Sequence, residues 1–155
     1  MITYIPAPRT PSEGTDQVTR VLVVDNSATA RKAIAAILNN VPDLQVVGEA
    51  ADGVEAIDLA ARLRPDVITM DINMPRMNGH EATRQIMAHT PTPIVVVTTV
   101  TRLQMIQQGF DILLAGALEI VQKPSSLSPH AFDAIRSELI AKVKLVSQIK
   151  FPQPG

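Results

Sequence analysis

The chain has 155 residues, 19% of them charged, no cysteine, and 14 Lys and Arg against 15 Asp and Glu, a net charge of −1. The missing cysteines exclude a disulfide framework, a cysteine-ligated zinc site and thiol catalysis. The balanced charge gives no basic field for nucleic acid or anionic membranes, and the apolar runs are shorter than the ~18 residues of a membrane span. We therefore expect a cytoplasmic, single-domain protein that binds neither nucleic acid nor membrane.

The two ends of the chain differ from its middle. Residues 1–19 hold several prolines and turn-forming residues without a hydrophobic period, which predicts a flexible leader. Residues 151–155 include two prolines and are expected to form a loose tail. A folded domain is then predicted over residues 20–150, with a last helix long enough to continue as a linker.

Within that domain, short β-branched runs alternate five times with apolar residues at helical spacing. In chain order the predicted strands cover residues 21–24, 44–47, 67–70, 94–97 and 118–121. The predicted helices follow them at about residues 28–41, 54–63, 79–88, 103–114 and 132–149. Strict alternation predicts an α/β fold, in which a five-stranded parallel sheet is covered by helices on both faces.

Polar residues follow four of the predicted strands, at the edge where such sheets bind ligands. They are Asp25 and Asn26 after the first strand, Asp71 after the third, Thr98 after the fourth and Lys123 after the fifth. Two carboxylates about 4 Å apart repel by about 4 kcal/mol at an effective dielectric constant near 20, so they need a hard cation such as Mg²⁺. A carboxylate can also attack phosphorus, and a hydroxyl and an ammonium can hold the transferred oxygens. The polar residues at this edge therefore predict a site for phosphoryl transfer.

Three segments resemble the signatures of response-regulator receiver domains. They are Val23-Val24-Asp25-Asn26-Ser27, Met70-Asp71-Ile72-Asn73-Met74-Pro75-Arg76-Met77-Asn78-Gly79 and Gln122-Lys123-Pro124. The resemblance covers about residues 20–149 and implies a flavodoxin-like, doubly wound sheet with strand order 2-1-3-4-5.

Within that family the chain is most similar to the N-terminal receiver of chemotaxis protein-glutamate methylesterases, through residues 46–53, 74–79, 98–101 and 138–144. The resemblance implies a two-component, chemotaxis-type protein with a histidine kinase as phosphodonor. It also implies a C-terminal methylesterase domain, or another effector, outside these 155 residues. No catalytic esterase residues are expected in the chain, because nothing in it supplies a Ser-His-Asp arrangement, and we do not expect it to be an enzyme.

The same resemblance assigns a role to each polar residue at the sheet edge. Asp71 corresponds to the phosphorylated aspartate, and Asp25 to the acidic-pocket residue that helps to hold Mg²⁺ through water. The backbone carbonyl of Asn73 corresponds to the third protein contact of the metal. Thr98 corresponds to the switch hydroxyl, and Lys123 to the lysine that contacts the phosphoryl group.

Two positions depart from the family pattern. Asn26 stands where the family has a second acidic residue that ligates the metal directly, so we expect weak Mg²⁺ binding. Ile120 stands where many receivers have a rotating aromatic residue, and an aliphatic side chain cannot give that movement. These departures leave an interaction-only receiver as an alternative. A phosphohydrolase is a further alternative, although it would need an aspartate where the chain has Asn73.

The predicted helix over residues 103–114 has more apolar residues than one face can bury. Met105 and Ile112 are therefore predicted to form a partner surface with the fifth strand and the last helix, which phosphorylation would switch. Asp52, like other acidic residues near the helix starts, is expected to be a solvated charge.

Overall fold

A computed structural model describes residues 17–126, 128 and 130–153, and it confirms the predicted α/β fold. Five parallel strands form one sheet in the order β2-β1-β3-β4-β5. The elements are β1 (Thr19–Val24), α1 (Ala28–Asn39), β2 (Leu44–Ala50), α2 (Gly53–Leu63), β3 (Val67–Met70), α3 (Gly79–His89), β4 (Ile94–Thr98), α4 (Arg102–Gln107), α5 (Ile112–Ala115), β5 (Glu119–Gln122), the 3₁₀ helix η2 (Ala131–Ile135) and α6 (Arg136–Val146).

The ends of the chain are described only in part. Residues 1–16 of the predicted leader and residues 154–155 of the predicted tail lie outside the described residues. Thr19, assigned to the leader by sequence, is the first residue of β1 and pairs with Leu44 of β2. Across the described part of the chain, no helix is both long and apolar enough to cross a membrane.

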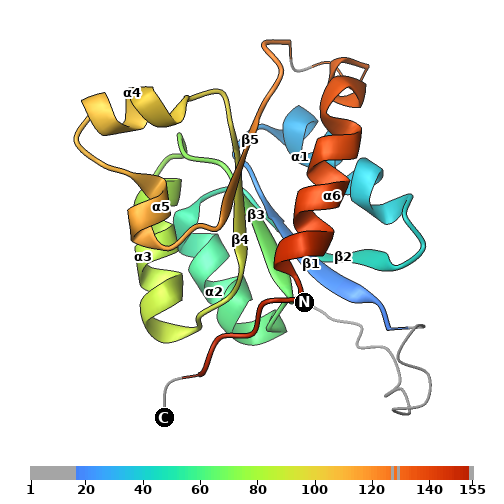
Figure 1. Ribbon diagram of the computed structural model, residues 1–155, viewed down its shortest axis with the longest axis horizontal. Coiled ribbons are helices and arrows are strands. Elements are labelled where there is room, and N and C mark those ends of the chain that lie inside the picture. The colour runs from blue at the N-terminus through green and yellow to red at the C-terminus, as the bar shows by residue number, and fades with distance from the viewer. Residues whose placement is uncertain (1–16, 127, 129, 154–155) are drawn as a thin grey trace.

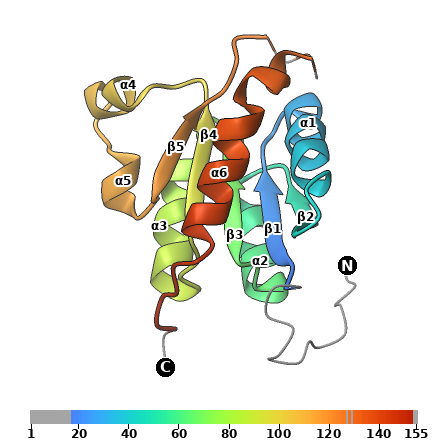
Figure 2. The same cartoon turned by 45° about the vertical axis from the view of Figure 1, so that its right-hand side comes forward.

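Helices cover both faces of the sheet and create two separate cores (Figures 1 and 2). Val21 and Val23 of β1 point into one core, which α1 and α6 cover, whereas Leu22 and Val24 point into the other, which α2 and α3 cover. All residues of β3 and β4 are buried. A strand that is buried on both faces favours apolar residues on both of them, which explains why these segments are apolar except for Thr69 and Thr98 and do not alternate.

The crossovers bring the carboxyl ends of the strands to one edge of the sheet, the upper edge in Figure 1. The chain passes from β1 to β2 on one side and then returns to β3 on the other, so the strand order reverses between β1 and β3. Asp25 and Asp71 directly follow these two strands, and the Asp71 N–H donates a hydrogen bond to the Val24 carbonyl at 3.0 Å. The site predicted from sequence therefore lies where open α/β sheets bind their ligands.

The prediction of one helix over residues 103–114 is wrong, because two short helices, α4 and α5, occupy this segment. Gly109 adopts a φ of +99°, which ends the first helix. Asp111 then starts the second by accepting a hydrogen bond from the Leu113 N–H. The prediction assumed one continuous helix over residues 103–114, and it therefore placed the wrong residues on the surface.

Met105 and Ile112 show this error directly. Both were predicted to lie on an exposed partner surface, yet both are 0% exposed and belong to the core that α2 and α3 cover. Because the break at Gly109 resets the helical phase, each short helix sends its own residue into that core. The exposed apolar residues here are instead Leu103, Ile106 and Leu114, the last with 86% exposure.

The last predicted helix, residues 132–149, is divided between η2 and α6 and ends at Val146. Its apolar stripe is buried as the spacing indicates: Phe132, Leu139 and Val143 are each 0% exposed. They pack with α1 over one face of the sheet, so this stripe completes the domain core.

Substitutions in α5 test the corrected assignment. Ile112→Ala is expected to lower the free energy of unfolding by about 2–5 kcal/mol, because it leaves a cavity in the core. Leu114→Ala, two positions away in the same helix, should change it by at most about 0.5 kcal/mol, because that side chain is exposed. Urea unfolding followed by far-ultraviolet circular dichroism measures both values. Equal losses in the two variants would contradict the assignment.

Candidate functional site

Two aspartates and a lysine meet at the carboxyl edge of the sheet. Lys123 Nζ lies 2.7 Å from Asp25 Oδ2 and 3.2 Å from Asp71 Oδ2. All three residues are buried, with exposures of 0% for Asp25, 5% for Asp71 and 8% for Lys123. They follow β1, β3 and β5, so the sheet topology alone brings them together from distant parts of the chain. One ammonium faces two carboxylates, so the trio carries a net negative charge when both carboxylates are ionised.

Each carboxylate has one oxygen held by a backbone N–H. Asp25 Oδ1 accepts from the Ser27 N–H at 2.9 Å, and Asp71 Oδ1 accepts from the Ile72 N–H at 2.7 Å. Asp25 Oδ2 is buried beside the Lys123 ammonium but has no hydrogen bond of favourable geometry with any described residue. Among the described residues, the 2.7 Å ion pair with Lys123 is thus the polar contact of this buried oxygen.

The pKa of Asp71 is raised above its ordinary value. The main cause is burial, which disfavours the charged form, and the second is repulsion by the Asp25 carboxylate. Lys123 acts in the opposite direction through its charge and its hydrogen bond, but it does not cancel the first two effects. The positive charge of Lys123 is therefore too small to stabilise the ionised form of both carboxylates fully.

A Mg²⁺ ion fits this set of donors. Over residues 17–126, 128 and 130–153, no three or more His, Cys, Asp or Glu side chains are grouped as a metal cluster. Mg²⁺ does not need such a cluster, because it is usually bound through one or two carboxylates and keeps several waters. Asp25 and Asp71 provide two carboxylates, which share a single ammonium, that of Lys123. Asn26 and Asn73 are exposed at the same edge and bring neutral carbonyl oxygens.

Thr98 and Lys123 lie at the ends of two adjacent strands. Thr98 is 0% exposed, and its Oγ1 accepts from the Val100 N–H at 3.2 Å. The Lys123 N–H donates to the Thr98 carbonyl at 2.8 Å, which extends the pairing of β4 and β5 beyond the strands. Ile120, in β5, is half-buried against the core that α2 and α3 cover.

Gln122 contributes to this edge although sequence reasoning gave it no role. Its Nε2 donates to the carbonyl of Thr98 at 3.1 Å and to that of Thr99 at 2.7 Å. These bonds fix the backbone that carries the Thr98 hydroxyl. The only sequence signal was its position directly before Lys123, which says nothing about the direction of its side chain.

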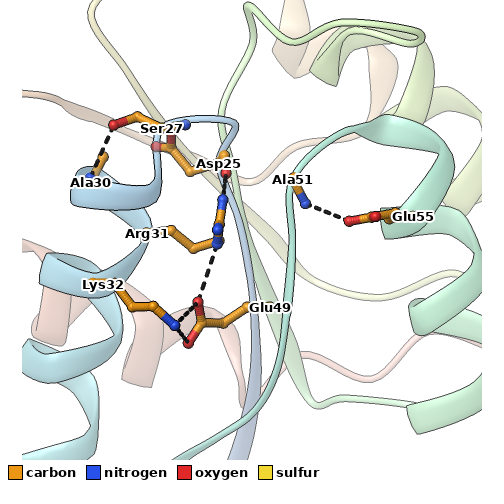
Figure 3. Close-up of polar contacts among 8 residues, drawn as sticks. All are labelled: Asp25, Ser27, Ala30, Arg31, Lys32, Glu49, Ala51 and Glu55. Atoms are coloured by element: carbon orange, nitrogen blue, oxygen red, sulfur yellow. Dashed lines mark hydrogen bonds and ion pairs between the residues drawn. The ribbon is translucent and has the colours of Figure 1, made fainter. Parts of the chain in front are cut away.

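Arg31 is a second residue that the sequence did not indicate (Figure 3). Its Nη1 donates to the Asp25 carbonyl at 2.8 Å, and its Nε donates to Glu49 Oε1 at 3.1 Å. Lys32 Nζ contacts the same Glu49 oxygen at 3.2 Å. Arg31 thus ties α1 and β2 to the turn that holds Asp25 and Asn26, and it fixes that turn from outside the acidic pocket.

Comparison with known proteins agrees with this geometry. The chain belongs to the response regulator receiver domain family, which it matches over residues 21–130. It is 49% identical over 131 residues to protein-glutamate methylesterase/protein-glutamine glutaminase 4 of Myxococcus xanthus, which covers 84% of this chain and 37% of that protein. Protein-glutamate methylesterase/protein-glutamine glutaminase 2 of Methanospirillum hungatei is 42% identical over 131 residues. That match also covers 84% of this chain and 37% of the relative. The chain therefore spans little more than a third of the length of these relatives.

Solved structures indicate the same type of receiver. The response regulator domain of Thermotoga maritima CheB superposes with a TM-score of 0.80 and 38% identity, covering 87% of this chain and all of that one. A chain of the CheX–CheY–BeF₃–Mg²⁺ complex of Borrelia burgdorferi gives a TM-score of 0.72 and 25% identity, over 89% of this chain and 95% of that one. The protein is thus a receiver domain of the CheB type, a component of two-component signalling.

The raised pKa of Asp71 predicts a specific pH dependence. Between the ordinary aspartate pKa and the raised one, the folded state binds more protons than the unfolded chain, so stability falls as the pH rises. Asp71→Asn removes this loss, and we expect the variant to be more stable than wild type at pH 7. The advantage should shrink as the pH falls from the raised pKa toward the ordinary one.

Urea unfolding of both proteins between pH 4 and pH 8 measures this difference. Asp58→Asn is the matched control, because it makes the same change at an exposed carboxylate of α2, outside the buried trio. A difference between Asp71→Asn and wild type that stays constant with pH would be incompatible with the buried-charge explanation.

Proposed function

We propose that this chain is a phospho-accepting regulatory module, in which a histidine kinase transfers a phosphoryl group to the Asp71 carboxylate. The observation that carries the proposal is the buried trio of Asp25, Asp71 and Lys123. It places the Asp71 carboxylate beside both an ammonium and a second carboxylate. As a chemotaxis-type signalling component, the module would act in the cytoplasm.

The residues of the trio divide the reaction between them. A carboxylate oxygen of Asp71 forms a bond to phosphorus while the bond from phosphorus to the kinase histidine breaks, and the imidazole leaves. The Ile72 N–H orients the carboxylate through Oδ1, and the Lys123 ammonium neutralises charge on the transferred oxygens. Bound Mg²⁺ would be held by Asp25, Asp71 and the carbonyl of Asn73, and it supplies charge neutralisation on the phosphoryl oxygens.

Phosphorylation would be communicated through β5 and its neighbours. Lys123 follows β5 directly and is bonded through its N–H to Thr98, so a shift of the ammonium toward a phosphoryl group would also affect β4. On the outer side, Lys142 Nζ of α6 donates to the Ile120 carbonyl of β5 at 2.8 Å. We propose that Thr98 and Lys123 rearrange together, and that the surface of α4, β5 and α6 changes its population of conformers.

The effector that this module would control is inferred from the relatives and not from this chain alone. The curated relatives are named as methylesterases and glutaminases, and the chain covers 37% of the first of them. We propose that the switched surface controls a C-terminal methylesterase domain, or another effector, that is not included in these residues. Its apolar side chains Leu103 and Ile106 on α4 are available for such a partner, in place of the buried Met105 and Ile112.

Phosphorylation is tested with acetyl phosphate, or with beryllofluoride, in the presence of Mg²⁺. Intact mass should show one phosphoryl group on the wild-type chain, and NMR should show a response to beryllofluoride. Asp71→Ala should abolish both, whereas Asp58→Ala should retain both. A wild-type chain that gives no response would instead be an interaction-only receiver, and multiple turnover of phosphate esters would indicate a phosphohydrolase.

Asn26 sets the expected strength of Mg²⁺ binding. Cation affinity rises with the number of charged ligands, and Asn26 contributes no charge. Asn26→Asp is therefore expected to tighten Mg²⁺ binding about tenfold, which corresponds to about 1.4 kcal/mol. The gain is limited because a third carboxylate also increases repulsion in the empty site.

Isothermal titration calorimetry with Mg²⁺ measures this effect. Asn40→Asp is the control, because it adds the same charge at the other end of α1, where the affinity should not change. Sub-millimolar binding by the wild-type chain, or an unchanged affinity in Asn26→Asp, would refute the proposed weakness.

A further inference from the structure

The loop between β3 and α3, residues 71–78, carries both Asp71 and Asn73. It is closed at its base, where the Gly79 N–H donates to the Ile72 carbonyl at 2.8 Å. Gly79 has no space for a side chain, because a Cβ there would lie 1.8 Å from the Asp71 carbonyl oxygen. The base of the loop is thus packed directly against the backbone of Asp71, while Asn73 itself is exposed.

The far part of this loop is attached to the start of α2 by an ion pair. Asp52 Oδ2 accepts from Arg76 Nε at 2.8 Å, and its other oxygen, Oδ1, accepts from the Glu55 N–H at 2.9 Å as the N-cap of α2. The Asp52 side chain is only 9% exposed. The expectation of a solvated charge at this position is therefore wrong, because both oxygens of the carboxylate have partners.

A backbone contact lies next to this ion pair. The Gly53 N–H donates to the Met77 carbonyl at 2.9 Å, and a Cβ on Gly53 would lie 2.5 Å from that oxygen. Arg76 itself has a φ of +63°, a left-handed conformation that is unfavourable for a residue with a side chain. Such a conformation persists only where its surroundings hold it. Here Asp52 contacts the Arg76 side chain, and backbone hydrogen bonds with Pro75 and Gly53 hold the next residue, Met77.

We propose that Asp52 and Arg76 are positioning residues for the phosphorylation site, and that their ion pair fixes the loop so that the Asn73 carbonyl is ready to bind the cation. The inference rests on the proposed function, because it concerns the Mg²⁺ site of that reaction. Without the pair, the loop keeps its closed base, the backbone bond between Gly53 and Met77, and the packing of Met74 and Met77 against the core, but it loses its side-chain attachment to the start of α2. The cation would then have to order the loop as it binds, and this cost would lower the Mg²⁺ affinity.

The alternative explanation is that Asp52 serves α2 alone, as its helix cap. The two explanations predict different effects for Asp52→Asn. Asn caps helices about as well as Asp, so this variant keeps the bond to Glu55 and loses the negative charge that holds Arg76. It is also expected to fold like the wild type. The lowered pKa of Asp52, caused first by the Arg76 hydrogen bond, agrees with a carboxylate that is charged at neutral pH.

The test compares Asp52→Asn, Arg76→Ala and the double variant with the wild-type chain. Calorimetry measures Mg²⁺ affinity, and urea unfolding measures stability. Arg62→Ala is the matched control, because it breaks an exposed ion pair with Asp58 on the same helix, α2. We expect each single variant to bind Mg²⁺ about tenfold more weakly, in the range seen when residues supporting a metal site are removed.

The double variant should bind Mg²⁺ no more weakly than either single variant, because all three lose the same interaction. Arg62→Ala should bind like the wild type. Wild-type affinity in Asp52→Asn, or losses that add in the double variant, would overturn the inference while leaving the proposed function intact. A wild-type chain that binds no Mg²⁺ and cannot be phosphorylated would overturn the proposed function and this inference with it.

Discussion

The arrangement at the sheet edge depends on one buried ammonium between two buried carboxylates. Without Lys123, the charges of Asp25 and Asp71 would have no buried counterion among the described residues, in a place where burying a charge costs several kcal/mol. The lysine reduces this cost without removing it, which is why the pKa of Asp71 remains raised. The fold therefore keeps the Asp71 carboxylate, the proposed nucleophile, in an environment that favours the arrival of further positive charge.

The surrounding structure holds this incompletely neutralised group in place. Each of the two loops that carry the acidic residues is tied to a neighbouring element by an arginine. Arg31 binds the Asp25 carbonyl and Glu49, and Arg76 binds Asp52. The guanidinium group suits this task, because it presents several donors in a fixed geometry. Both arginines stay outside the trio, so they stabilise its backbone without taking over the role of its counterion.

Sequence reasoning identified the strands and the trio because both depend on short-range rules. Continuous apolar runs specify buried parallel strands, and the residue after each strand lies at the ligand-binding edge whatever the details of packing. Asp25, Asp71 and Lys123 could therefore be placed at this edge from sequence, because each follows the end of a predicted strand. The correct strand order, in contrast, came from the family resemblance and not from any pattern in the residues.

The errors arose where distant contacts or a single backbone torsion decide the structure. A φ of +99° at Gly109 divides a segment whose apolar spacing fits one helix, and this moved Met105 and Ile112 from the predicted surface into the core. The partnership of Asp52 and Arg76 joins residues 24 positions apart, and no local pattern indicates it.

The net negative charge of the trio also has a kinetic consequence. In the proposed function the phosphodonor brings its own negative charge, so the site without a cation would repel it. Under the proposed function, neutralisation by a cation would come before the approach of the donor. With Asn26 in place of an acid, it would depend more strongly on the surrounding cation concentration. The response of this domain would therefore follow two inputs, the activity of its kinase and the supply of free divalent metal.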